Sequence, residues 1–248
     1  MKKILCDAVV FDQGNTIVMD PFKNALSKAK KKLERIMRRA GVKMSAQRIE
    51  REWTRSNSAI DFPFSGHFVQ EEIFVQDFMR RAGISSEKIA VLAPLLLSEY
   101  RKNYINEVRV QINKRKIKKF LIELKSKGKK IGIFSNDKSI GLNSALESCG
   151  IKKYFDYIET SEEFRREKPD PAVFRRIEKK MGVARKKIVY VGDDPKRDII
   201  PAKRFGMSAV LYLVSDSYHE KWRNYAYKKN CSPDAEVRNL QQLLSIIE

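Results

Sequence analysis

The sequence is poor in the residues that cross-link small secreted proteins or bind metals through soft ligands. Its 248 residues include three cysteines, Cys6, Cys149 and Cys231, and only two histidines. The cysteine count is odd, and the three positions do not have the spacing of metal ligands. A framework in which every cysteine forms a disulfide within the chain is therefore excluded. We expect a reduced, cytoplasmic protein.

The sequence also has no long hydrophobic run. No stretch approaches the roughly 20 apolar residues that a membrane span requires, so we expect no membrane association. The first residues resemble a signal peptide, but Asp7 and Asp12 interrupt their apolar run and no small-residue cleavage site follows. We interpret this segment as a first strand.

Acidic residues are few relative to basic ones. Lys and Arg number 51 against 31 Asp and Glu, which gives a net charge of +20. Such a charge favours anionic partners such as phosphate esters, nucleic acid or acidic surfaces. The basic residues are spread along several predicted helices and are rarely interleaved with aromatics, so we favour solvated helix faces over a nucleic-acid site. The oligomeric state is not indicated.

Short apolar runs alternate with helical patterns in residues 1–16 and 108–248. This alternation predicts an α/β fold with a Rossmann-like parallel sheet core. We expect residues 214–231 to form a short packed helix, and Val237 to Ile247 to form a terminal helix. The predicted strands are 8–11, 130–134, 157–158, 188–191 and 209–212.

Residues 17–107 have a different pattern, because apolar residues recur at helical spacing and no strand pattern is present. Leu26, Ala29 and Leu33 are examples. We expect an inserted α-helical cap domain. The insert leaves the core at the carboxyl end of the first strand, where open α/β sheets bind ligands, so it is placed to act as a lid.

Four short polar segments follow or lie near the predicted strands. They are FDQGNT at 11–16, FSND at 134–137, EKPDP at 167–171 and GDDPKRD at 192–198. A carboxylate after a buried strand, followed by a Gly-Asn turn, is presented beside free backbone amides that can bind an anion. Three aspartates within 193–198 crowd negative charge that a cation or a lysine must offset. Mg²⁺ binds through one or two carboxylates together with phosphate oxygens, so the pattern favours phosphoryl transfer.

In this order and spacing, the four segments resemble the four motifs of the haloacid dehalogenase superfamily, and the helical insert is similar to that family's cap. The resemblance implies a Mg²⁺-dependent phosphatase of small phosphorylated metabolites that forms an aspartyl-phosphate on Asp12. It also implies catalytic roles for Ser135 and Lys168. The implied phosphate-binding groups are Gln13, Gly14 and Asn136. The implied metal group comprises Asp12, the carbonyl of Gly14, Asp193, and Asp194 or Asp198 from a second layer.

One position departs from the family's phosphatases. They usually carry a second aspartate two residues after the nucleophile, where this chain has Gly14. A substitute proton donor would have to come from elsewhere, for example from Asp20, Glu71, Glu72 or His67. We favour a helix-entry role for His67, although it stays a candidate substrate-binding residue.

Two alternatives remain open. The first is a metal-independent haloacid dehalogenase, because such enzymes lack the second aspartate and share the Ser-Asn pair. They use no metal, however, and the acidic cluster at 193–198 argues for Mg²⁺ and therefore against this alternative. A non-catalytic descendant that binds nucleic acid or another anion is compatible with Gly14 and the net charge. The intact catalytic positions oppose that reading.

Overall fold

In the computed structural model the described residues are 3–61, 71–136, 139–214 and 232–248. They form two compact units. One unit combines Met1–Met19 with Gln111–Glu248, and the other is Asp20–Val110. The last helix of the second unit continues across position 107, where we expected the core to resume, and ends at Lys114. None of the described helices is long and apolar enough to cross a membrane.

The first unit is built on a six-stranded parallel sheet with the order β3-β2-β1-β4-β5-β6. This order and the flanking helices confirm the predicted Rossmann-like α/β fold. All five predicted strands are present. The strands are β1 (Ala8–Phe11), β2 (Lys130–Ser135), β3 (Tyr157–Thr160), β4 (Ile188–Gly192), β5 (Ser208–Tyr212) and β6 (Ala235–Val237).

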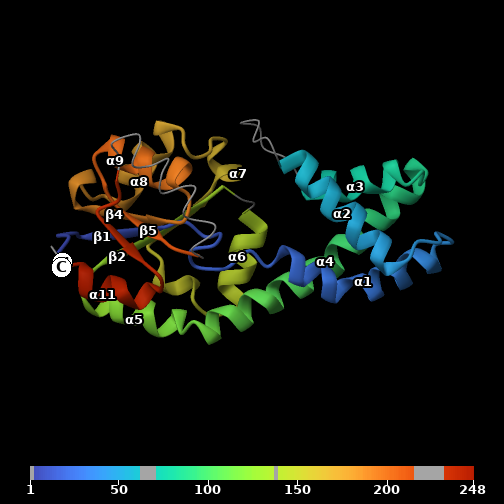
Figure 1. Ribbon diagram of the computed structural model, residues 1–248, viewed down its shortest axis with the longest axis horizontal. Helices are drawn as coiled ribbons and strands as arrows, with labels where there is room; N and C mark the ends of the chain where they lie inside the picture. Colours follow the sequence, from blue (N-terminus) through green and yellow to red (C-terminus); the bar gives the residue numbers. More distant parts are fainter. Residues whose placement is uncertain (1–2, 62–70, 137–138, 215–231) are drawn as a thin grey trace. The chain divides into compact units, whose positions relative to one another are not determined.

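Helices cover both faces of this sheet (Figure 1). Residues Ala8 and Val10 face α8 and α9 within one buried cluster, while Phe11 points to the other face and meets Phe120 of α5 edge-on. The strands are buried on both sides and therefore consist of nearly continuous apolar runs. The helices of this unit are α5 (Ile117–Ser126), α6 (Ser139–Ser148), η1 (Lys152–Tyr154), α7 (Ser161–Phe164), α8 (Pro171–Met181), η2 (Arg185–Lys187), η3 (Pro195–Ile199), α9 (Ile200–Phe205), η4 (Leu240–Gln242) and α11 (Leu243–Ile246).

The expected terminal helix from Val237 to Ile247 is wrong at its start. Val237 ends the short strand β6, and its carbonyl accepts a hydrogen bond from the Leu213 amide at 2.8 Å. The helical residues begin only after Asn239, whose side chain caps the Gln242 amide while the Gln242 side chain bonds back to the Asn239 amide. This reciprocal cap sets the helix start, because it requires Asn239 to be extended. Residues 215–231 lie outside the described part of the chain.

In its described part, the second unit consists of helices. Its mainly aliphatic core contains an aromatic group, in which the ring of Trp53 stacks on Phe78 at 5.6 Å and lies 5.2 Å from Tyr100. The apolar positions of the first helix that suggested helical spacing, Leu26 and Leu33 among them, are buried in the same cluster. The helices are α1 (Phe22–Arg39), α2 (Ala46–Asp61), α3 (Glu71–Arg81) and α4 (Ser86–Lys114).

Candidate functional site

Three polar residues lie at the carboxyl ends of three neighbouring strands. Asp12 follows β1, Ser135 ends β2, and Asp193 follows β4. The registers pair Phe11 with Ile133 on one side and with Val191 on the other. The strand order reverses between β1 and β4, and open α/β sheets bind ligands beyond such a switch point. The sheet therefore brings segments that are far apart in sequence to its ligand-binding edge.

A buried lysine connects two of the carboxylates. The ammonium group of Lys168 donates to Oδ1 of Asp12 and to Oδ1 of Asp198, both at 2.6 Å. Lys168 is only 2% exposed. Burial alone would lower the pKa of this lysine, but the two carboxylates outweigh burial and raise it well above its ordinary value. The lysine is therefore a fixed positive charge.

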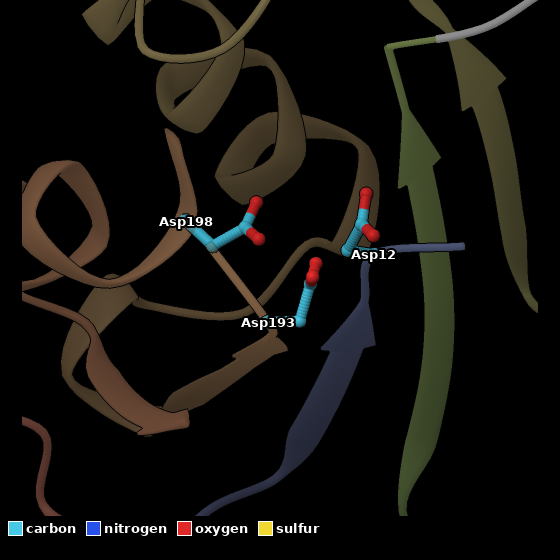
Figure 2. Close-up of side chains that lie close together, drawn as sticks. All are labelled: Asp12, Asp193 and Asp198. Atoms are coloured by element: carbon cyan, nitrogen blue, oxygen red, sulfur yellow. The ribbon is translucent and has the colours of Figure 1, made fainter. Parts of the chain in front are cut away.

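Asp193 completes a cluster of three buried carboxylates with Asp12 and Asp198 (Figure 2). One oxygen from each lies within 4.8 Å of the others. Burial, followed by the charges of Asp12 and Asp198, raises the pKa of Asp193 to about 8. One ammonium offsets one of three carboxylates, so the ionised cluster retains an excess of negative charge. A divalent cation would neutralise this excess, and an all-oxygen donor set suits a hard ion such as Mg²⁺.

Within this cluster Asp198 is held by protein donors. Its Oδ1 accepts from Lys168 and its Oδ2 accepts from the Asp194 amide at 3.1 Å. Burial raises the pKa of Asp198 and Lys168 opposes that rise, with a net value of about 6. A side chain at Gly192 would overlap the Asp198 carboxylate, so glycine is required there. With both oxygens bonded to the protein, Asp198 is better suited to hold Lys168 than to ligate a metal directly.

Asp194 is not part of the carboxylate cluster. Its Oδ1 accepts from the amides of Lys196 and Arg197 at 2.7 and 3.1 Å, and its Oδ2 accepts from Nε of Arg197 at 2.7 Å. These bonds cap the single turn η3. These three hydrogen bonds give Asp194 a structural role, and its place among the metal-binding residues stays a prediction that the geometry does not favour.

The loop after Asp12 is a tight turn. The carbonyl of Gln13 accepts from the amides of Ile17 and Val18, both at 3.0 Å, and Asn15 has a φ of 54°. Gly14 is not in a left-handed conformation, and a Cβ built on it would meet only Oδ2 of Asp12, at 3.9 Å. Neither the backbone nor the space available therefore requires glycine at this position.

Two contacts of this site were not predicted. The side chain of Asn136 forms two hydrogen bonds with the main chain of Lys168, and the ammonium of Lys168 lies 5.4 Å from the centre of the Tyr190 ring. The sequence places both residues near the site, because Asn136 follows Ser135 directly and Tyr190 is the one aromatic residue in β4. The spacing of the motifs contained no information about these contacts.

Arg115 is a third residue that the motif analysis missed. Its guanidinium donates to the carbonyls of Ile17 at 2.6 Å and Thr16 at 2.8 Å, and to the hydroxyl of Tyr212 at 2.8 Å. Gln111, one helical turn earlier, exchanges hydrogen bonds with the main chain of Met19 at 2.7 and 2.9 Å. The outgoing and returning segments of the chain are thus fastened together beside the Asp12 loop. His67 lies outside the described residues.

The fold and the site define a class: an α/β core that presents an aspartate, a lysine and further carboxylates at the switch point of a parallel sheet. A sequence model of the haloacid dehalogenase-like hydrolase family matches residues 71–212, more than half of the chain. The chain belongs to this family. The family assignment confirms the resemblance deduced from the four motifs.

Comparison with individual proteins agrees with this assignment. A glyceraldehyde 3-phosphate phosphatase of Methanocaldococcus jannaschii is 34% identical over 133 residues, which are 52% of this chain and 54% of that protein. The chain therefore spans about half the length of the curated relatives it matches. Two solved structures share the fold. A 2-haloacid dehalogenase of Pseudomonas syringae is 21% identical, with a TM-score of 0.67 and coverage of 98% of each chain. A haloacid dehalogenase-like (HAD) hydrolase of Bacillus subtilis bound to magnesium is 17% identical, with a TM-score of 0.64 and coverage of 98% of each chain.

Proposed function

We propose that this protein is a Mg²⁺-dependent phosphatase that removes phosphate from a small phosphorylated metabolite. The observation that carries the proposal is the buried cluster in which Lys168 bonds Asp12 while Asp193 lies close by with excess negative charge. Relatives named as phosphatases support it, including the glyceraldehyde 3-phosphate phosphatase and a phosphoglycolate phosphatase of Escherichia coli.

In the proposed reaction a carboxylate oxygen of Asp12 attacks phosphorus and the bond to the leaving oxygen breaks, which forms an aspartyl-phosphate. The leaving oxygen takes a proton from solvent water and departs as the alcohol. Water then cleaves this acyl phosphate, releasing inorganic phosphate and restoring the carboxylate. Lys168 fixes the orientation of Asp12 and offsets charge on the phosphoryl oxygens. The hydroxyl of Ser135 and the amides of Gln13 and Asn136 would bind those oxygens. Asp12 and Asp193, with the Gly14 carbonyl, would hold Mg²⁺, which supplies charge neutralisation when bound.

We expect phosphate release from a panel of phosphate monoesters in Mg²⁺, loss of release in chelator, and recovery when Mg²⁺ is added back. Because Gly14 offers no acidic side chain, an aryl ester with an acidic leaving group should react fastest. Phosphate release is measured directly for each ester under the three conditions. Release that chelator does not affect would contradict the proposed metal dependence.

The second candidate is a metal-independent haloacid dehalogenase. Gly14 and the shared fold of the 2-haloacid dehalogenase from Pseudomonas syringae are compatible with it. Chloride release from a 2-haloacid in chelator, with no phosphate release from any ester, would favour it. The unbalanced carboxylates Asp12, Asp193 and Asp198 argue against it, because a metal-free reaction gains nothing from burying them together.

We expect the stabilisation by Mg²⁺ to grow with pH. In the metal-free fold, Asp193 with a pKa of about 8 and Asp198 with a pKa of about 6 bind protons more tightly than they do unfolded. Their contribution to stability is therefore complete below about pH 4 and is lost as the pH rises through about 8. Since Mg²⁺ must displace a proton from Asp193, its apparent affinity should rise about tenfold per pH unit below pH 8.

The test measures melting temperatures with Mg²⁺ and with chelator between about pH 5.5 and about pH 8.5, a range that brackets both pKa values. The difference between the two curves removes contributions from other titrating groups. An Asp193→Asn variant serves as the matched control and should show a small difference that does not depend on pH. An equal Mg²⁺ effect at both ends of the range in the wild type would rule out proton competition at Asp193.

A further inference from the structure

The main chain of Lys168 is held by a single neighbouring side chain. Nδ2 of Asn136 donates to the Lys168 carbonyl at 2.9 Å, and Oδ1 of Asn136 accepts from the Lys168 amide at 2.9 Å. One carboxamide thus satisfies both polar backbone groups of the lysine, in the manner of a neighbouring strand.

This pairing occurs where regular structure offers no support. Lys168 lies in the turn before α8, outside any helix or strand. Its side chain must nevertheless reach two carboxylates that belong to different elements, with both bonds at 2.6 Å. A lysine side chain has about four rotatable bonds and loses much rotamer freedom when it is fixed. Both ends of the residue are therefore held: the ammonium by Asp12 and Asp198, and the backbone by Asn136.

The anchor of this pairing directly follows a paired strand and is itself part of the proposed site. Asn136 follows Ser135, the last residue of β2, and β2 pairs directly with β1, which precedes Asp12. A displacement of the Lys168 backbone would have to be transmitted to this strand end or break both hydrogen bonds. The same side chain therefore sets the distance between the segment that carries the Ser135 hydroxyl and the segment that carries the lysine.

We propose that Asn136 acts through its side chain as a positioning residue, which registers Lys168 against Asp12 and couples the lysine segment to the Ser135 strand end. The expected effect on turnover rests on the proposed phosphatase function, whereas the expected effect on the position of Lys168 does not. Since Lys168 offsets charge that develops during phosphoryl transfer, its misplacement reduces turnover more than substrate binding.

Asn136→Ala removes both hydrogen bonds. We expect kcat on the aryl phosphate in Mg²⁺ to fall about 10- to 100-fold, with KM changed less than about threefold, because a misplacement near 1 Å can cost about 10²-fold. Asn136→Asp keeps the oxygen that accepts from the Lys168 amide and loses the donor to the Lys168 carbonyl. Its kcat should therefore lie between those of the wild type and Asn136→Ala. Asn239→Ala is the matched control, since it removes a side-chain cap on the main chain at η4, which contributes no residue to the proposed site. Its kcat should stay within about twofold of the wild type.

Amine-reactive labelling followed by peptide mass spectrometry gives a readout that does not require activity. Lys168 should be almost unreactive in the wild type and in Asn239→Ala, because it is buried and bonded to two carboxylates. Its labelling rate should rise at least about tenfold in Asn136→Ala, because the turn that carries it loses its anchor. Increased labelling without phosphate release from any wild-type sample would retain the positioning role and reject the proposed phosphatase. Unchanged labelling, or a kcat within about twofold of the wild type, would overturn the positioning role.

Discussion

Asp12→Asn is expected to reduce phosphate release by at least about 10³-fold, because the amide cannot act as the attacking carboxylate. The variant should remain folded. Asparagine has nearly the same shape, its side-chain oxygen can still accept from Lys168, and the change removes one of three crowded negative charges. The measurement is turnover in Mg²⁺ on the ester that the wild type hydrolyses fastest, together with the melting temperature of each protein.

Asp7→Asn provides the matched control, since it makes the same chemical change at an exposed position directly before β1, the strand that Asp12 follows. Its turnover should equal that of the wild type. An acid-quenched reaction should in addition trap one phosphoryl group on the peptide that contains Asp12 in the wild type and none in Asp12→Asn. Residual activity of Asp12→Asn near the wild-type level would show that another group attacks phosphorus, and a phosphoryl group on a different peptide would identify it.

Lys168→Met should affect both activity and stability strongly. Methionine fills a similar volume but leaves Asp12 and Asp198 buried without their cation. Breaking a buried ion pair by removing one partner costs about 3–5 kcal/mol of unfolding free energy. Loss of the lysine also raises the pKa of Asp198 beyond its present value of about 6, because Lys168 is the group that lowers it. The deficit should therefore be smaller at pH 5, about one unit below that pKa, where the carboxylate is protonated, and larger at pH 8.

Denaturant unfolding in chelator at the two pH values measures this deficit. Lys152→Met is the matched control, because Lys152 and Glu147 form an ion pair of the same 2.6 Å length on the surface. Exposed pairs contribute about 0–1 kcal/mol, so the control should lose little stability at either pH. A Lys168→Met deficit no larger than that of the control would mean that water or relaxation of the chain compensates the buried carboxylates.

Much of the core could be predicted from the sequence because its signals are local. Each of the five predicted strands is a short run of branched and aromatic residues, and burial on both faces of the sheet requires such runs. The polar residues of the site come directly after these runs. Since parallel strands end at the same edge of a sheet, the places of Asp12, Ser135 and Asp193 after these runs are enough to bring the three residues to one edge.

The contacts that refine the site could not be predicted in the same way. Asp193 and Asp194 are identical neighbours in the sequence, yet one faces the cluster and the other caps η3, because the chain turns between them. The bonds between Asn136 and Lys168 join residues 32 positions apart, and no periodicity encodes them. The strand β6 has only three residues, too few for an alternating pattern, and it is stabilised by pairing with β5.

Gly14 has a consequence for how this chain can change by mutation. Since a Cβ there would meet only Oδ2 of Asp12 at 3.9 Å, and the backbone is not left-handed, the fold tolerates a side chain at this position. Gly192, by contrast, is closed to substitution by the Asp198 carboxylate. The glycine codons GGU and GGC differ from the aspartate codons by a single base, so from either of them the acidic residue usual in the family's phosphatases is one point mutation away, and no steric overlap of its Cβ opposes the change. The architecture thus leaves the choice of leaving group open to selection acting on one codon, while the rest of the catalytic framework stays intact.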